Sequence, residues 1–171
     1  MKALLVIDML KDFIERGGAL ECGEAARLIV PFVRSKINEF RTTGNLVIFV
    51  KDAHRPDDLE FRMFPPHCVR GTRGAEIIDD LDVSPSDVIV EKTRYSAFFG
   101  TDLEKILLDR AVTEVHVVGV CTSICVMDTV GDLRNRDYPV IVYQQGVADF
   151  DAEAHRFALK RMEKIYGAKV I

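Results

Sequence analysis

The chain has 171 residues, of which 48% are hydrophobic and 8% aromatic. That is enough for one domain with a substantial core, spanning residues 1–171, and too little for two such domains. The formal net charge is -4 and the two signs are mixed along the chain, so there is no basic stripe for a nucleic-acid partner.

Membrane insertion and disulfide bonding are also not expected. No stretch contains the roughly 18 consecutive apolar residues that a membrane span needs. Charged residues such as Lys2 and Asp8 interrupt any N-terminal signal core, which predicts a cytoplasmic protein. The four cysteines are too few and too unevenly spaced for a disulfide framework, so reduced thiols are expected. These are Cys22, Cys68, Cys121 and Cys125.

Short apolar runs rich in β-branched residues alternate along the chain with amphipathic stretches. In chain order, strands are predicted over residues 3–9, 46–52, 87–92, 114–120, 139–145 and 168–171. Helices are predicted over residues 24–42, 102–111, 123–136 and 151–166. An aperiodic segment over residues 53–74 is long for a loop in a compact domain, and loops of that length are usually functional.

This alternation, with strands that are apolar on both faces, predicts an α/β fold. We expect three layers, α/β/α, around a doubly wound, mostly parallel sheet of six strands in a single domain. Ligands of such sheets bind outside the carboxyl ends of the strands, where the strand order reverses. Polar residues at those ends are therefore the first candidates for a functional site.

The segment "GVCTSICVMDT", residues 119–129, places two cysteines at the end of the fourth predicted strand. Thr122 or Ser123 is positioned to cap the next helix, so Cys125 falls in its first turn, where the helix dipole lowers a thiol pKa. This strand-to-helix turn favours Cys125 as a nucleophile, with the backbone N–H of Cys121 as a donor to an oxyanion. The alternative is that both are small buried core residues, as free cysteines often are.

Two charged residues end other predicted strands. Asp8 follows the first strand and Lys92 ends the third. Each taken alone is more often a solvated charge at a strand end. The sheet, however, brings Asp8, Lys92 and Cys125 to one crevice, where an acid to accept the thiol proton, a cation and a thiol form a nucleophilic site.

The long loop after the second strand carries a second group of candidate residues. Asp52 and His54 are two apart at the strand end, and Glu60 and His67 follow. Two imidazoles and two carboxylates suit Zn²⁺, Fe²⁺ or Mn²⁺ and leave coordination positions free for water or substrate. The D-x-H pair by itself is a weak signal, and taken alone it favours a solvated polar loop over a metal site.

Two isolated histidines and two phenylalanines complete the set of side chains with a possible role. His116 and His155 have no clustered partners in sequence and are interpreted as structural. Phe13 and Phe64 flank the predicted crevice and are able to hold a flat ring between them, although core packing is the alternative for each.

The ordered set of motifs is similar to the isochorismatase-like cysteine hydrolases, and most similar to their nicotinamidase branch. The resemblance covers nearly the whole chain, through "LLVIDMLKDF", "DAH", "FPPHCVRGTRGAE", "EKTRYSAFFGTDLEKIL", "GVCTSICV" and "GVADF". It implies a catalytic triad at Asp8, Lys92 and Cys125.

The resemblance also implies a metal site, an oxyanion hole and a substrate position. One divalent ion, zinc first and iron or manganese otherwise, would bind Asp52, His54, His67 and, in one branch of the family, Glu60. A cis peptide bond before Cys121 would turn the N–H groups of Cys121 and Cys125 into an oxyanion hole. The aromatic neighbours of the substrate would correspond to Phe13 and Phe64.

The expected function is metal-dependent hydrolysis of nicotinamide to nicotinate and ammonia in NAD salvage, by a homo-oligomer, a dimer or tetramer. Three alternatives stay open at this point. One is an amidase of the same superfamily that acts on another small carboxamide, and another is a non-catalytic sensor of a nicotinamide-like ligand. The third is a redox pair at Cys121 and Cys125, which their spacing by four disfavours.

Overall fold

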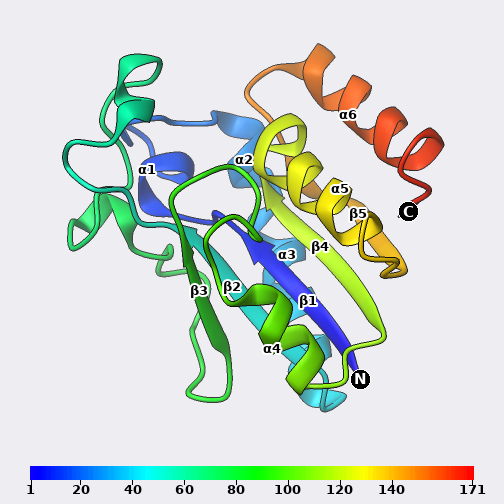
Figure 1. The fold of residues 1–171 in the computed structure, drawn as a ribbon. Helices are drawn as coiled ribbons and strands as arrows, with labels where there is room; N and C mark the ends of the chain where they lie inside the picture. Colours follow the sequence, from blue (N-terminus) through cyan, green and yellow to red (C-terminus); the bar gives the residue numbers. More distant parts are fainter.

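The computed structural model describes all 171 residues, which form one parallel sheet with helices on both faces (Figure 1). The sheet contains β1 (Lys2–Ile7), β2 (Leu46–Asp52), β3 (Val88–Lys92), β4 (Glu114–Val120), β5 (Val140–Ala148) and β6 (Lys169–Val170). Its strand order is β3-β2-β1-β4-β5-β6, and every pair is parallel. The predicted α/β class and six strands are confirmed, although β1 ends two residues earlier than predicted, β5 runs three residues further and β6 is shorter.

The pattern of side chains along each strand explains its place in the sheet. In the central strand β1, every residue from Ala3 to Ile7 is buried, because helices cover both faces. The edge strand β3 instead alternates, with Val90 buried and Ile89 exposed. The most uniformly apolar runs of the sequence therefore occupy the middle of the sheet.

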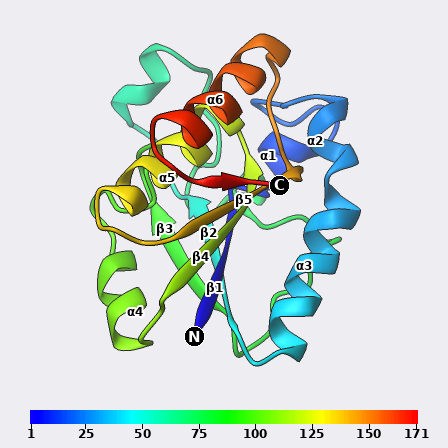
Figure 2. The ribbon, with the colours of Figure 1, turned by 90° about the vertical axis from the view of Figure 1, so that its right-hand side faces the viewer.

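The helices form two layers, which the side view separates clearly (Figure 2). One layer contains α1 (Lys11–Ile14), α2 (Glu24–Leu28) and α3 (Val30–Thr42), and the other contains α4 (Leu103–Asp109), α5 (Met127–Arg134) and α6 (Ala152–Lys164). Each layer closes its own apolar core against one sheet face. None of these helices has both the length and the apolar character required to cross a membrane.

Two helix predictions need correction. The single helix predicted over residues 24–42 is two helices, α2 and α3, which meet at Ile29. Pro31 follows that junction and has no N–H to donate to the carbonyl of Arg27, so the regular ladder is interrupted. The helix predicted over residues 123–136 begins instead as a π-helical turn, Thr122–Val126, and becomes α-helical only in α5.

The strand order reverses between β1 and β4. From β1 the chain moves outward through β2 to β3, then crosses back so that β4 pairs with the other side of β1. Crevices at such switch points are where ligands of open α/β sheets bind. The residues that follow β1 and β4 therefore lie at the predicted position of the site.

Gly119 allows β4 to approach β1 just before this crevice. It pairs with Ile7, adopts a positive φ of 120°, and lies where the β4–β5 register shifts. A Cβ atom added at Gly119 would lie 2.0 Å from the carbonyl oxygen of Ile7, which is backbone and has no freedom to move away. The close approach of the two strands thus requires glycine at this position.

We therefore expect Gly119→Ala to lower the free energy of unfolding by about 3 kcal/mol or more, because it combines a backbone clash with an unfavourable φ. Gly44 is a matched control, since its φ is also positive, at 68°, but nothing lies within 4 Å of an added Cβ. Gly44→Ala should lower it by only about 1–2 kcal/mol. Urea unfolding measures both, and equal losses would contradict the clash.

Candidate active site

Asp8 is held rigidly at the carboxyl end of β1. Its backbone N–H donates to the carbonyl of Val50 at 2.9 Å, and its φ is +52°. Its side-chain Oδ1 accepts a hydrogen bond from the Asp52 backbone N–H at 3.0 Å. The carboxylate is completely buried. The end of β2 therefore fixes both the backbone and the side chain of Asp8.

Lys92 lies beside two carboxylates in the interior. It is the register partner of Asp52 on the neighbouring strand β2. Its Nζ lies 2.5 Å from Asp52 Oδ1 and 2.8 Å from Asp8 Oδ2. The same ammonium donates to the Cys125 sulfur at 3.5 Å. One cation thus contacts all the candidate groups at three strand ends.

The pKa values reflect competition between burial and charge pairing. Burial, reinforced by the Asp52 carboxylate and opposed by Lys92, raises the pKa of Asp8 to about 6. Burial alone would lower the pKa of Lys92, but the Asp52 and Asp8 carboxylates outweigh it, and this pKa lies well above its usual value. Lys92 is therefore a permanent cation, whereas Asp8 titrates within reach of neutral pH.

Cys125 lies in the π-helical turn between β4 and α5, and two details of its predicted setting are wrong. Neither Thr122 nor Ser123 caps a helix with its side chain: the Thr122 hydroxyl contacts His155, and the Ser123 backbone N–H donates to Asp149. The pKa of Cys125 is raised well above the usual thiol value, because burial outweighs the ammonium of Lys92. The thiol therefore needs a base.

The structure brings this thiol and the acid together, as the sheet argument predicts. Single ligand atoms of Asp8, Asp52 and Cys125 lie within 4.8 Å of one another. Asp8 Oδ2, next to Lys92, is buried and accepts no aligned hydrogen bond. Apart from its ion pair with Lys92, this oxygen is available to accept a proton beside the candidate nucleophile.

The loop after β2 folds back on itself, which brings distant histidines together. His54 forms a β-bridge with Val69: its N–H donates to the Cys68 carbonyl at 3.0 Å, and its carbonyl accepts from the Arg70 N–H at 2.9 Å. The imidazoles of His54 and His67 consequently lie with their centroids 4.9 Å apart. Loop closure, not sequence proximity, assembles this pair.

Asp52, His54 and His67 form a buried cluster of the kind that binds a divalent metal. One ligand atom from each lies within 4.8 Å of the other two. His67 Nδ1 contacts the Pro65 carbonyl at 2.8 Å, which requires a proton on Nδ1 and leaves Nε2 as the lone-pair atom. His54 Nε2 lies 3.4 Å from Asp52 Oδ2 and has no hydrogen-bond partner.

Glu60 lies at the edge of this cluster. Its Oε1 is 3.8 Å from His67 Nε2, its Oε2 is buried without a hydrogen-bond partner, and burial raises its pKa. Unpartnered buried polar atoms of this kind are costly unless something binds them. Two orphaned atoms, Nε2 of His54 and Oε2 of Glu60, within a His and carboxylate donor set therefore fit a divalent ion.

Asp58 and Arg94 support the cluster, and the sequence analysis missed both. Asp58 Oδ2 accepts from Nδ1 of His54 at 3.1 Å, which directs Nε2 toward Asp52. Arg94 donates to both oxygens of Asp58, at 3.0 and 3.1 Å. Burial opposes ionisation of Asp58. The hydrogen bonds that its carboxylate accepts from the Glu60 amide and from His54 outweigh burial and lower the pKa of Asp58 to about 2. Arg94 lies within the motif "EKTRYSAFFGTDLEKIL" and was therefore open to prediction, whereas Asp58 lies four residues beyond "DAH", outside any motif.

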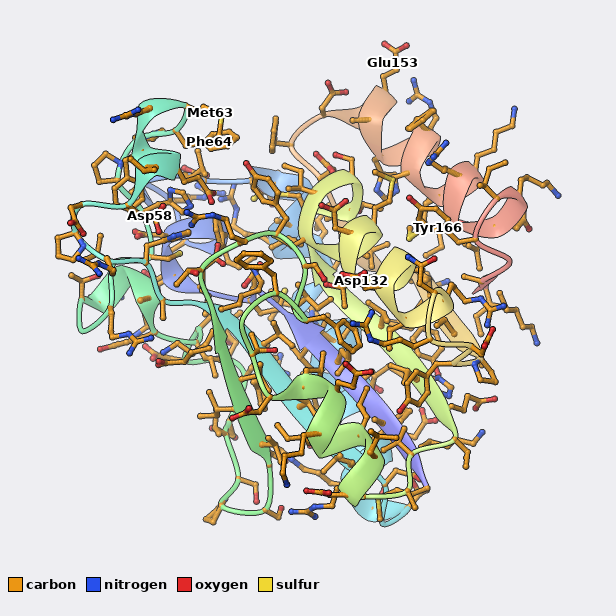
Figure 3. All side chains as sticks on the ribbon, in the orientation of Figure 1. Asp58, Met63, Phe64, Asp132, Glu153 and Tyr166 are labelled. Carbon is orange, nitrogen blue, oxygen red and sulfur yellow. The ribbon has the colours of Figure 1, made fainter.

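A pocket with about 430 Å³ of empty space, including its open mouth, lies over these groups. Both predicted aromatics line it, Phe13 from α1 and Phe64 from the loop after β2, where Figure 3 labels Phe64 together with Asp58 and Met63. The Phe13 and Phe64 rings lie 5.5 and 6.3 Å from the His67 ring. The wall also contains residues that sequence reasoning missed, namely Leu20, Cys22, Tyr95, Ile124 and Phe150.

The peptide bond between Val120 and Cys121 is cis, as the resemblance implies. Cys121 and Cys125 line the same pocket as Asp8. The two histidines interpreted as structural lie apart from it: His116 bridges Glu114 and Tyr143 at 2.8 Å each, and His155 contacts Thr122. His155 therefore does have a partner, one that joins α6 to the turn carrying Cys125.

A family model described as the isochorismatase domain matches residues 2–171. The chain belongs to this family. A solved structure of nicotinamidase PncA from Bacillus subtilis is 41% identical, with a TM-score of 0.94, and covers 99% of this chain and 98% of that one. A pyrazinamidase/nicotinamidase from Streptococcus mutans is 34% identical, with a TM-score of 0.95, over the full length of both chains. The pyrazinamidase of Pyrococcus horikoshii, solved in complex with zinc, is 34% identical, with a TM-score of 0.94, over 99% and 98% of the two chains.

Because the Lys92 ammonium pairs with the buried carboxylates of both Asp8 and Asp52, Lys92→Met should lower the free energy of unfolding by about 3–5 kcal/mol. Lys105→Met, which breaks an exposed pair with Asp109, should leave the unfolding midpoint near that of the wild type. Chemical denaturation at neutral pH measures both variants. A Lys92→Met protein as stable as Lys105→Met would contradict this account of the buried ion pairs.

Proposed function

We propose that this protein is a metal-dependent nicotinamidase, an amidohydrolase that converts nicotinamide to nicotinate and ammonia and so feeds NAD salvage. The observation that carries the proposal is the position of the buried Asp8, Lys92 and Cys125 group directly beside the Asp52, His54 and His67 cluster, under one pocket. The nicotinamidase relatives of the family support the choice of amide.

The pocket suits a flat, uncharged aromatic amide. Ten of its 14 lining residues are hydrophobic, and Phe13 and Phe64 would contact the ring. One divalent ion, with zinc as the first choice, would be held by Asp52, His54, His67 and Glu60. A protein of similar structure, the pyrazinamidase of Pyrococcus horikoshii, is in complex with zinc. When bound, this ion would supply a Lewis acid for the ring nitrogen, which orients the carboxamide toward Cys125.

In the first half of the reaction, Asp8 would accept the proton of Cys125, and the sulfur would attack the carboxamide carbon. The backbone N–H groups of Cys121 and Cys125 would stabilise the oxyanion that forms. Asp8 would then return the proton to the departing nitrogen, releasing ammonia and leaving a thioester on Cys125. Lys92, fixed by two carboxylates, would hold Asp8 and the sulfur in register throughout.

In the second half, Asp8 would accept a proton from water, whose oxygen attacks the thioester carbon. Collapse of this second tetrahedral intermediate breaks the C–S bond, and Asp8 gives its proton to the departing sulfur, which restores the Cys125 thiol and the Asp8 carboxylate while the product leaves as nicotinate. The raised pKa of Asp8, about 6, matches a group that accepts and donates a proton within one turnover. The cytoplasmic location and the homo-oligomer expected from the sequence stay predictions.

Cys125→Ala should lower the rate of ammonia release from nicotinamide at least about a thousandfold, because loss of a nucleophile removes the covalent route. A coupled ammonia assay on protein loaded with Zn²⁺, Fe²⁺ or Mn²⁺ measures it. Cys68→Ser is the matched control: this buried cysteine lies outside the pocket lining, and its rate should stay within a few fold of the wild type. Comparable turnover by Cys125→Ala would refute the mechanism. If the wild type released no ammonia with any of the three metals, the substrate would have to be a carboxamide other than nicotinamide.

Asp58→Asn should weaken Zn²⁺ binding about tenfold or more, because the charged acceptor that fixes the His54 ring is lost. Asp57→Asn offers a matched control on the neighbouring residue, whose exposed carboxylate pairs only with Arg55. Competition with a chromogenic chelator in the absence of substrate measures both affinities. If Asp58→Asn bound zinc as tightly as Asp57→Asn, Asp58 would have no positioning role.

A further inference from the structure

Two cysteines that the proposed mechanism does not use as thiols are in contact in the pocket wall. The sulfur atoms of Cys22 and Cys121 lie 3.1 Å apart, although the residues are 99 positions apart in sequence. Both thiols are free and buried: the exposed fraction of the residue surface is 2% for Cys22 and 8% for Cys121. Both line the pocket above Cys125, so a small molecule that enters the pocket reaches them.

The two residues belong to segments of different character. Cys22 lies in the loop between α1 and α2, where its N–H donates to the Phe13 carbonyl at 2.8 Å. The next residue, Gly23, has a positive φ of 85° and nothing within 4 Å of an added Cβ. Cys121 is instead fixed, between the end of β4 and the turn that carries Cys125. Open space therefore adjoins the loop at the residue that follows Cys22.

We propose that Cys22 and Cys121 are a covalent modification site, a dithiol that a hydroperoxide converts to a disulfide across the pocket wall. A disulfide requires the two sulfurs to approach to about 2.05 Å, so they must move together by about 1 Å. Side-chain rotation and a small shift of the Cys22 loop supply a movement of that size. The pairing joins residues from two separate segments, unlike a local C-x-x-C motif.

The chemistry balances with hydrogen peroxide as the oxidant. We place the first attack on the Cys22 sulfur, which lies on the loop, with the Cys121 sulfur 3.1 Å away to complete the bond. The Cys22 sulfur bonds to one peroxide oxygen, the O–O bond breaks, and the departing hydroxide takes the Cys22 proton to form water. The Cys121 sulfur then attacks the Cys22 sulfenic acid, the S–O bond breaks, and this hydroxide takes the Cys121 proton. Two thiols are oxidised by two electrons, and one peroxide becomes two waters.

The disulfide would change the pocket at its reactive end. Cys121 supplies one of the proposed oxyanion donors, and Phe13, a proposed ring contact, accepts the Cys22 N–H. Displacements near 1 Å at such positions lower turnover by an order of magnitude or more. Formation of the disulfide is independent of the proposed function, whereas this loss of nicotinamide hydrolysis rests on it.

The test treats the full-length, metal-loaded protein with hydrogen peroxide, alkylates the remaining thiols and measures intact mass and linked peptides. We expect the four free thiols to fall to two, the mass before alkylation to fall by two hydrogens, and a peptide link between Cys22 and Cys121. Dithiothreitol should reverse all three changes. Cys22→Ser should form no such link, and Cys68→Ser, which removes a buried cysteine outside the pair, should still form it.

Two results would overturn the proposal. One is oxygen added to Cys125 while Cys22 and Cys121 are both still alkylated, and the other is a link between any other two cysteines. Nicotinamide hydrolysis is assayed in parallel, as the ratio of oxidised to reduced rates for each variant. If the wild type forms the Cys22–Cys121 link but its ratio of oxidised to reduced hydrolysis rates does not fall about tenfold, the proposed effect of the disulfide on turnover is refuted. If nicotinamide is not a substrate, the mass measurement still decides whether the dithiol forms.

Discussion

The buried ammonium of Lys92 is the interaction on which the site depends. Two carboxylates that lie out of water, Asp8 and Asp52, are compatible with a folded core only because this cation lies between them. Asp52 also faces the metal cluster, since its Oδ1 contacts Lys92 and its Oδ2 faces His54. The proposed nucleophilic group and the candidate metal cluster therefore share one carboxylate, so a shift of Asp52 would disturb both.

The parallel sheet supplies the precision that this arrangement needs. Register fixes Asp52 opposite Lys92, and the backbone of Asp8 continues the ladder from β1 to Val50 of β2. The remaining groups lie on segments that are pinned elsewhere. Asp12, on α1, accepts hydrogen bonds from the N–H groups of Cys68 and Ala19, so one carboxylate ties the metal loop to the loop that ends at Cys22. These loops are thus positioned by the half-buried carboxylate of Asp12, while strands are positioned by pairing.

Much of this organisation was predictable from the sequence, because it follows from rules that act along the chain. Apolar runs located the strands, and the rule that ligands bind at their carboxyl ends selected Asp8, Lys92, Cys125 and Asp52. Contacts between loops obey no such rule. The pairing of Cys22 with Cys121 and of Arg94 with Asp58 depends on how separate segments pack. The prediction of a lowered pKa for Cys125 was wrong for a related reason. The helix-terminus argument used local geometry, whereas desolvation by the whole fold has the larger effect and raises this pKa.

That raised thiol pKa is itself informative about how the site must react. With Cys125 neutral, the interior holds the cation of Lys92 against two carboxylates, which leaves a net charge of about -1 by formal counting. Losing the thiol proton to solvent would make this charge more negative in a desolvated space, and that is why the pKa rises. Transfer of the proton from Cys125 to Asp8 moves a negative charge from oxygen to sulfur and leaves the net charge unchanged. Because Lys92 contacts both atoms, it stays paired with the charge before and after the transfer. Burial therefore suppresses free ionisation of the thiol, whereas the internal transfer in the proposed mechanism adds no net charge to this desolvated space.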